Sequence, residues 1–290
     1  MKPIQYIVIA AALALTAGLY WGGKTVAPKK EKPEAGTMAA GGGTAGDMQA
    51  AAMNLPEPAR FDTLLAGAKK KISPAAQAEI SRQENTITRG NVQEQQAQAY
   101  EALGKLWQQN KNKAVAAYYF AESGKLDNSQ KKLNFAAHLM WEELQDEANP
   151  NKRQWMAHVA ADCYRKSLEL DPDNDTARIN LAEMYINGSG ETMKGIEQLL
   201  SIVRKDSTNI PANTILGRMA VESGQLDKAV QRGYTILRVD KNNVEARLFT
   251  AEALKRQGQA AKAKELLKEA QKLVKEPSFV KDLDDYMKTF

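Results

Sequence analysis

Histidine and cysteine are the side chains most suited to nucleophilic or metal chemistry, and this chain has few of them. It contains His138, His158 and one cysteine, Cys163. Neither histidine stands at zinc-ligand spacing from the cysteine or from the other histidine. Cys163 shares a predicted helix with Ala160 and Tyr164, where a small buried thiol suits packing, and no residue suggests itself as its catalytic base. We therefore predict a protein that is not an enzyme and has no metal site or bound cofactor.

Two further patterns resemble ligand sites but lack essential parts. Asp171, Asp173 and Asp175 have the spacing that opens a calcium loop, yet the glycine and the terminal glutamate of such a loop are missing. A role in helix capping explains these aspartates better. The glycine-rich runs at Gly41 and Gly188 match neither the phosphate-binding loop nor the dinucleotide fingerprint.

The charge distribution argues against nucleic-acid binding. The formal net charge is +5, but 29 of the 40 basic and 27 of the 35 acidic residues lie in residues 96–290, which are therefore nearly neutral. Between Lys255 and Lys272 the basic residues alternate with Glu265 and Glu269 at helical spacing. This pattern predicts an ion-paired, solvated surface and not a phosphate-binding track.

Small residues recur along the second two-thirds of the chain and indicate the elements that position everything else. Most intervals within each of two sets are 33 to 35 residues, and in three repeats the second set follows the first by 12 residues. A small residue on each of two antiparallel helices lets their backbones approach closely, so each repeat is predicted to be a helix pair. The first set is Gly104, Ala137, Ala182, Gly217 and Ala251, and the second is Ala116, Ala160, Gly195, Ala229 and Ala263.

Polar residues mark the ends of these pairs. An aspartate followed by a turn residue closes four of the units, and in the last three an asparagine follows the aspartate by three residues. The side chain of such an asparagine can cap the next helix. The aspartates are Asp127, Asp171, Asp206 and Asp240, and the asparagines are Asn174, Asn209 and Asn243.

The first unit carries six residues of a known signature: Tyr100, Leu103, Gly104, Trp107, Ala116 and Phe120. With the 34-residue period, these residues make the chain resemble the tetratricopeptide repeat family. The resemblance implies an all-α fold, a right-handed superhelical solenoid of about five helix pairs. Its units would be residues 97–130, 130–174, 175–209, 210–243 and 244–277, preceded by N-terminal helices in 60–95 and followed by a capping helix at 278–290.

Two departures from the regular pattern carry expectations of their own. Gly195 stands where the family prefers alanine and Gly233 where it prefers an aromatic residue, and since glycine inside a helix costs about 1 kcal/mol relative to alanine, we expect both to loosen local packing. In the second unit Ala137 and Ala160 are 23 residues apart instead of 12. We expect these 11 extra residues to lengthen the first helix and to form a turn at 147–152 that emerges as a surface loop.

The N-terminus has the composition of a membrane anchor. Residues 4–21 form an apolar run of 18 residues, close to the shortest length that spans a bilayer as a helix, and Tyr20 and Trp21 suit the aromatic belt at an interface. Residues 1–21 are therefore predicted to be an uncleaved signal anchor, with a cleaved signal peptide as the alternative. Residues 22–59 are rich in glycine, alanine, proline and lysine and are predicted to be a flexible linker.

The side of the membrane on which the repeats lie is less directly encoded. Four lysines follow the apolar run and only Lys2 and the terminal amine precede it, which by count would keep the repeats in the cytoplasm. The short basic start before an apolar core has the form of an export signal, and acidic residues dilute the later lysines. We favour a single-pass membrane protein of a bacterial envelope whose repeat domain is extracytoplasmic, or periplasmic where two membranes exist.

The resemblance also indicates where a partner would bind. In the family, the first helix of each unit lines a concave groove that suits an extended peptide or a helix. We predict a membrane-tethered scaffold that binds proteins or peptides there, in envelope protein assembly or maturation. The alternative is a structural envelope protein that self-associates through Trp141, Trp155 or the inserted loop. By offset, the groove residues are Asn134, His138, Trp141, Ile179, Asn180, Glu183, Asn187, Arg218 and Glu222.

Overall fold

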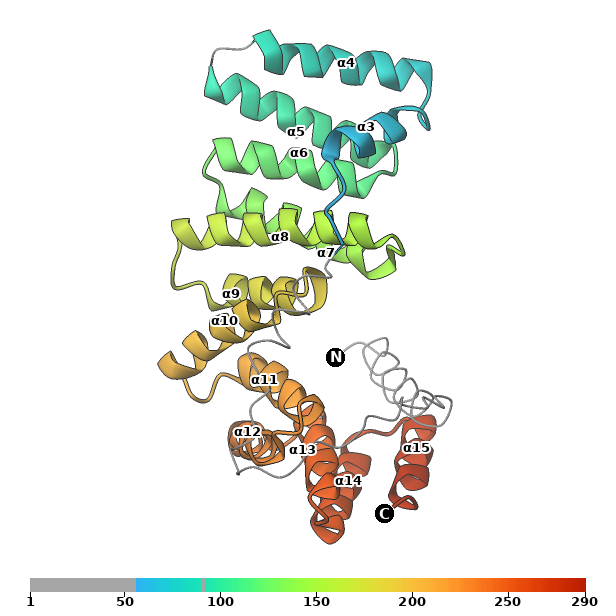
Figure 1. The fold of residues 1–290 in the computed structure, drawn as a ribbon, viewed down its shortest axis with the longest axis vertical. Helices are drawn as coiled ribbons and strands as arrows, with labels where there is room; N and C mark the ends of the chain where they lie inside the picture. Colours follow the sequence, from blue (N-terminus) through green and yellow to red (C-terminus); the bar gives the residue numbers. More distant parts are fainter. Residues whose placement is uncertain (1–55, 90–91) are drawn as a thin grey trace, which may run out of the picture.

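A computed structural model describes residues 56–89 and 92–290 of the chain as a curved stack of helices (Figure 1). These residues form thirteen α-helices and one π-helical turn, and none of them forms a strand. The predicted all-α class is thus confirmed. The predicted anchor, residues 1–21, and most of the predicted linker, residues 22–59, lie outside the described ranges. None of the described helices has both the length and the apolarity needed to cross a membrane.

Ten helices form five successive antiparallel pairs, and the remaining three flank them. The pairs are α5 (Gln93–Gln109) with α6 (Lys113–Leu126), α7 (Gln130–Asp146) with α8 (Pro150–Leu170), α9 (Asp175–Glu183) with α10 (Thr192–Lys205), α11 (Ile210–Glu222) with α12 (Leu226–Val239), and α13 (Val244–Arg256) with α14 (Ala260–Leu273). Before them lie α3 (Phe61–Lys69) and α4 (Pro74–Arg89), after them lies α15 (Pro277–Met287), and the π-helical turn η1 (Met184–Gly188) extends α9.

Asparagine caps begin the first helices of the last three pairs. The side chains of Asn174, Asn209 and Asn243 each accept a hydrogen bond from the backbone amide three residues further on, at 2.8 to 3.0 Å. Each cap satisfies a backbone donor that the helix itself leaves unpaired, which is worth about 1 kcal/mol. The capping predicted for these three residues is confirmed.

Close backbone approach at small residues holds each pair together. The alanines of the second set are fully buried in the seams between paired helices. A Cβ atom added to Gly104 would lie 2.6 Å from the Phe120 ring, and one added to Gly217 would lie 2.7 Å from the Phe249 ring. These glycines therefore make room for an aromatic ring, so their side-chain hydrogen is required by packing.

The expectation that Gly195 and Gly233 loosen the packing is wrong. A Cβ atom on Gly195 would stand 2.6 Å from Ile186 and 2.7 Å from the carbonyl oxygen of Ala182, and one on Gly233 would stand 1.6 Å from the hydroxyl of Thr250. Neighbouring side chains and backbone already fill the space that a methyl group would take. The glycines permit a closer approach of helices than the family's usual residues would allow.

The 11 extra residues of the second unit are almost entirely helical. Helix α7 has 17 residues against 13 in α11, and α8 has 21 against 14 in α12, so the two extensions together account for the insertion. Helix α8 begins at Pro150, capped by Asn149, and only three residues connect it to α7. The expected surface loop over 147–152 is therefore replaced by a lengthened pair, because proline is well tolerated in the first turn of a helix.

The single extra residue of the third unit is absorbed as the π-helical turn η1. The amide of Ser189 donates to the carbonyl of Met184, five residues earlier, at 2.9 Å. This turn packs on the lengthened part of α8, where the Gln154 side-chain amide donates to the carbonyl of Ser189 at 3.1 Å. One-residue insertions in helices commonly take this form. The two insertions thus lie against each other.

The glycine finding predicts opposite outcomes for two alanine substitutions. Gly195→Ala should destabilise the protein by about 1–3 kcal/mol, because the new methyl group overpacks the seam. Gly67→Ala in α3, where a Cβ atom would meet nothing within 4 Å, should stabilise it by up to about 1 kcal/mol through helix propensity. Urea unfolding followed by circular dichroism measures both, and a Gly195→Ala protein as stable as the parent would contradict the packing argument.

Candidate functional site

The nine predicted groove residues lie on the first helices of the second, third and fourth pairs. Their side chains range from partly buried to exposed. Asn134, His138 and Trp141 lie on α7; Ile179, Asn180 and Glu183 lie on α9; Asn187 lies in η1; and Arg218 and Glu222 lie on α11.

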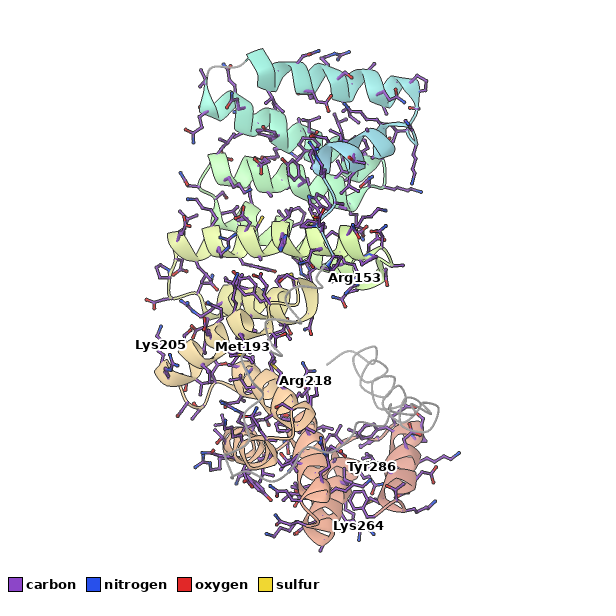
Figure 2. All side chains as sticks on the ribbon, in the orientation of Figure 1. Arg153, Met193, Lys205, Arg218, Lys264 and Tyr286 are labelled. Carbon is purple, nitrogen blue, oxygen red and sulfur yellow. The ribbon has the colours of Figure 1, made fainter. Side chains whose placement is uncertain are left out.

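A charged group joins three successive first helices. Arg218 of α11 forms an ion pair with Glu245 of α13, with 3.2 Å between guanidinium nitrogen and carboxylate oxygen. Glu183 of α9 interacts electrostatically with both of these residues. Figure 2 shows Arg218 on the side of α11 toward which α15 lies, inside the bend of the stack. The structure therefore brings together two of the predicted residues, Glu183 and Arg218, with a third that sequence reasoning missed.

Glu183 has no close partner within the described part of the chain. No hydrogen bond and no ion pair within 4 Å involves its carboxylate, because Arg218 is engaged by Glu245. Burial raises the pKa of Glu183, the Arg218 charge opposes that rise, and repulsion from Glu245 adds to it. A partly buried carboxylate in this state gains if a cation approaches, since pairing offsets the cost of desolvation.

Asn180 and Asn134 are turned toward the protein interior. Asn180 forms a side-chain hydrogen bond with Tyr164 of α8, a contact that lowers the pKa of that phenol, although burial dominates and raises it to about 12. The Oδ1 atom of Asn134 is buried and has no hydrogen-bond partner among the described residues. Asn180 therefore ties α9 to α8, and neither amide is as open to a partner as the groove prediction assumed.

The remaining groove residues form no group with Glu183. Exposed His138 lies 3.3 Å from the Glu142 carboxylate on the same helix. Trp141 is partly buried against the core cluster that extends from α3 to η1. Asn187 and Glu222 are exposed at or near the ends of their helices. The candidate site is therefore centred on α9, α11 and α13, and α7 contributes a separate surface.

Glu245 escaped sequence reasoning because its contact crosses two helix pairs. It is the second residue of α13, whereas Arg218 lies in the second half of α11, 27 positions earlier. The repeat period could have revealed it, since the start of one first helix lies near the middle of the preceding one in such a stack. We considered offsets within single units only, and these do not include that contact.

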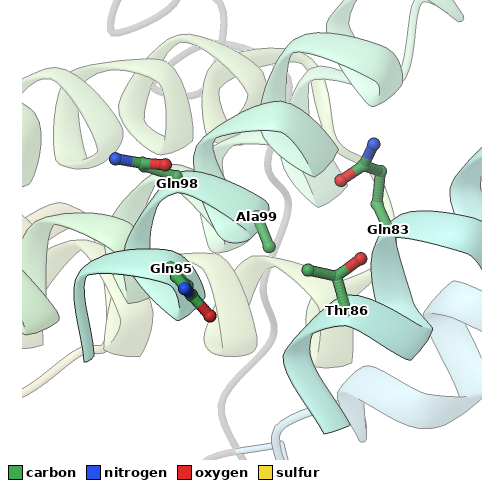
Figure 3. Close-up of a pocket in the computed structure, with 5 residues that line it drawn as sticks. All are labelled: Gln83, Thr86, Gln95, Gln98 and Ala99. Carbon is green, nitrogen blue, oxygen red and sulfur yellow. The ribbon is translucent and has the colours of Figure 1, made fainter. Parts of the chain in front are cut away.

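Surface depressions elsewhere are small. One of about 240 Å³ lies between α4 and α5 and is lined by Gln83, Thr86, Gln95, Gln98 and Ala99 (Figure 3). Binding pockets for small organic ligands usually measure about 300–1,000 Å³ and are mostly apolar, so this open, glutamine-rich depression does not resemble one. Among the described residues, no three histidine, cysteine, aspartate or glutamate side chains are grouped so that they could hold a metal ion.

The C-terminal pairs decide the family. Residues 220–278, which include α12, α13 and α14, match the family model described as tetratricopeptide repeat. The chain is a tetratricopeptide repeat protein. No curated protein matches its sequence.

Solved structures share the fold of this tetratricopeptide repeat protein at low sequence identity. A tetratricopeptide repeat protein from Parabacteroides merdae superimposes with a TM-score of 0.51 and 16% identity, covering 66% of this chain and 73% of that one. YrrB, described as having an unusual peptide-binding site, gives 0.46 and 16%, covering 64% and 91%. MamA from Desulfovibrio magneticus gives 0.47 and 16%, covering 61% and 94%. The first of these shows that the fold is shared, and at this identity it shows nothing further.

The raised pKa of Glu183 predicts how its replacement changes stability with pH. The folded protein binds this proton more tightly than the unfolded chain does, so the carboxylate costs stability as the pH rises above its ordinary pKa of 4.5. Glu183→Gln should therefore be more stable than the parent at pH 7 and indistinguishable from it below pH 4.5. Thermal unfolding at a series of pH values measures the difference.

Glu101 of α5 provides a control of opposite sign. Hydrogen bonds from Lys105 and then Lys132 lower its pKa to about 2, so its carboxylate stabilises the folded state above its ordinary pKa, and this contribution is lost as the pH falls toward 2. Glu101→Gln should be less stable than the parent at pH 7. If both variants shifted stability in the same direction at pH 7, the assignment for Glu183 would fail.

Proposed function

We propose that this tetratricopeptide repeat protein is a membrane-tethered scaffold that binds an extended peptide or a helix of another protein on the surface formed by α9, α11 and α13. The observation that supports this is the group formed by Glu183, Arg218 and Glu245, in which one carboxylate remains unpaired. Helix repeats of this kind present a long surface built from successive first helices, which suits extended partners.

The charges of the site indicate the chemistry of the partner. A peptide that brings a lysine or arginine side chain to Glu183 would pair a carboxylate whose charged form burial disfavours. The Arg218–Glu245 pair beside it is half-exposed, so it can exchange partners at small energetic cost. The described residues offer no acid, base and nucleophile set in this surface, and we propose a role in assembly or maturation of envelope proteins, without catalysis.

Site-specific photocrosslinking in native membranes tests the binding surface. A photoreactive residue at exposed Asn187 should capture a partner, whereas the same residue at Tyr234, 42% exposed on the second helix α12, should not. Arg218→Glu should reduce the yield at position 187, because it breaks the pair with Glu245 and adds a negative charge. Equal capture at both positions, or capture that ignores Arg218→Glu, would exclude this surface.

The tether rests on the apolar run in residues 4–21. We expect the full chain to stay with membranes after alkaline carbonate washing and to become extractable when residues 4–21 are deleted. Protease added to intact cells with a permeabilised outer layer should degrade the repeat domain if it is extracytoplasmic. Protection from the protease until the inner membrane is lysed would place the repeats in the cytoplasm and refute that part of the proposal.

Self-association is the second candidate function, and the structure changes the terms on which it can occur. Trp155, one of its predicted contacts, is only 7% exposed, because Phe61 of α3 lies against it. Trp141 is partly buried in the same core cluster. A second copy could reach Trp155 only after α3 had moved away.

A further inference from the structure

An aromatic site on the second helices holds the N-terminal end of the described chain. The ring of Phe61 stacks on Tyr118 of α6 with 3.6 Å between centroids and an interplanar angle of 21°, and it meets Tyr119 edge-on at 5.7 Å. On its other side lies Trp155 of α8, at 6.0 Å between centroids. Three aromatic side chains from two helices thus surround one phenylalanine.

The backbone next to Phe61 is also recognised. The amide of Ala59 donates a hydrogen bond to the carbonyl of Asn151 at 2.9 Å, and residues 56–60 are not helical. Downstream, Leu64, Leu65 and Ala68 pack on the same core. The site therefore holds residues 56–69, named the N-terminal segment here, in the way that a groove holds a peptide ligand: one backbone contact and a row of apolar anchors.

The insertion in the second unit builds this site. In α6, α10, α12 and α14 the second helix begins three residues before its small seam residue, whereas α8 begins ten residues before Ala160. The seven additional residues, 150–156, contain both Asn151 and Trp155. A unit of ordinary length would lack the hydrogen-bond acceptor and the tryptophan. The insertion that distinguishes this chain from a regular repeat thus has an occupant.

The N-terminal segment depends on this site for its structure. Helix α3 has only nine residues, fewer than a helix needs to be stable alone in water. Only residues 70–73 connect it to α4, and of these only Ile72 is even partly buried. Lys69 at the end of α3 pairs with Glu84 of α4 at 2.6 Å. Undocking would leave the segment unfolded and would expose the aromatic site.

We propose that this aromatic site is an interface between copies of the chain, in which the N-terminal segment of one copy occupies the site of a second copy. The two copies would then make the contacts seen within one, so exchange creates and loses few interactions. The single chain prevails at low concentration because covalent linkage holds its own segment at an effective concentration in the millimolar range. The proposal does not rest on binding at α9, α11 and α13.

Mixing two full-length variants tests the exchange. Phe61→Ala keeps the site but removes the anchor of the segment, and Tyr118→Ala keeps the segment but removes the surface on which Phe61 stacks. Each variant alone should remain monomeric in detergent solution. Their equimolar mixture should form a one-to-one heterodimer, measured by light scattering after size exclusion and by energy transfer between labels, up to about 0.1 mM, within tenfold of the effective concentration in one chain.

Two controls make every outcome decisive. The double variant Phe61→Ala with Tyr118→Ala should form no dimer with the Phe61→Ala chain, and circular dichroism must show that each variant is folded. If Phe61→Ala does not fold, Leu64→Ala replaces it as the segment variant. A mixture of folded variants that stays monomeric overturns the proposal, and so does a dimer that the double variant forms equally well. Wild-type dimers that grow with concentration and disappear with either single variant support it.

Discussion

Close approach of helix backbones is the constraint on which the rest of this structure depends. The seams tolerate only a hydrogen or a methyl group, and at Gly233 a methyl group would overlap the hydroxyl of Thr250. Because each helix touches its neighbours so closely, the stack is held together by contacts that repeat along the chain and not by one central core. Side chains on the outer surfaces are left to vary, and both candidate interaction surfaces lie there.

The two surfaces differ in kind. The surface on α9, α11 and α13 is charged and contains a carboxylate without a close partner, so it has interactions still to make. The aromatic site on α6 and α8 is already filled by Phe61 and is almost closed to solvent. A scaffold that carries an open polar surface and an occupied aromatic one can bind a partner through the first while the second controls how copies of the scaffold meet.

The small-residue period was sufficient to predict the helix pairs and the asparagine caps, because both follow from local rules of packing and capping. The same reasoning misjudged Gly195 and the stretch 147–152. Whether a glycine loosens a seam depends on what lies opposite it, here Ile186 and the Ala182 carbonyl. Whether an insertion becomes a loop depends on whether its apolar residues find a surface, and Trp155 found one beneath α3.

For the candidate site, sequence offsets placed Glu183 and Arg218 on first helices, but their grouping with Glu245 was decided by the way α13 stacks on α11. The sequence by itself determined the period, the fold class and the scarcity of catalytic side chains, since these depend on residue types and spacing. Tertiary structure decided which side chains meet, because contacts between repeats join residues about 30 or more positions apart whose distance no local rule specifies. It also decided that the second unit's insertion would build a site for the chain's own N-terminal segment.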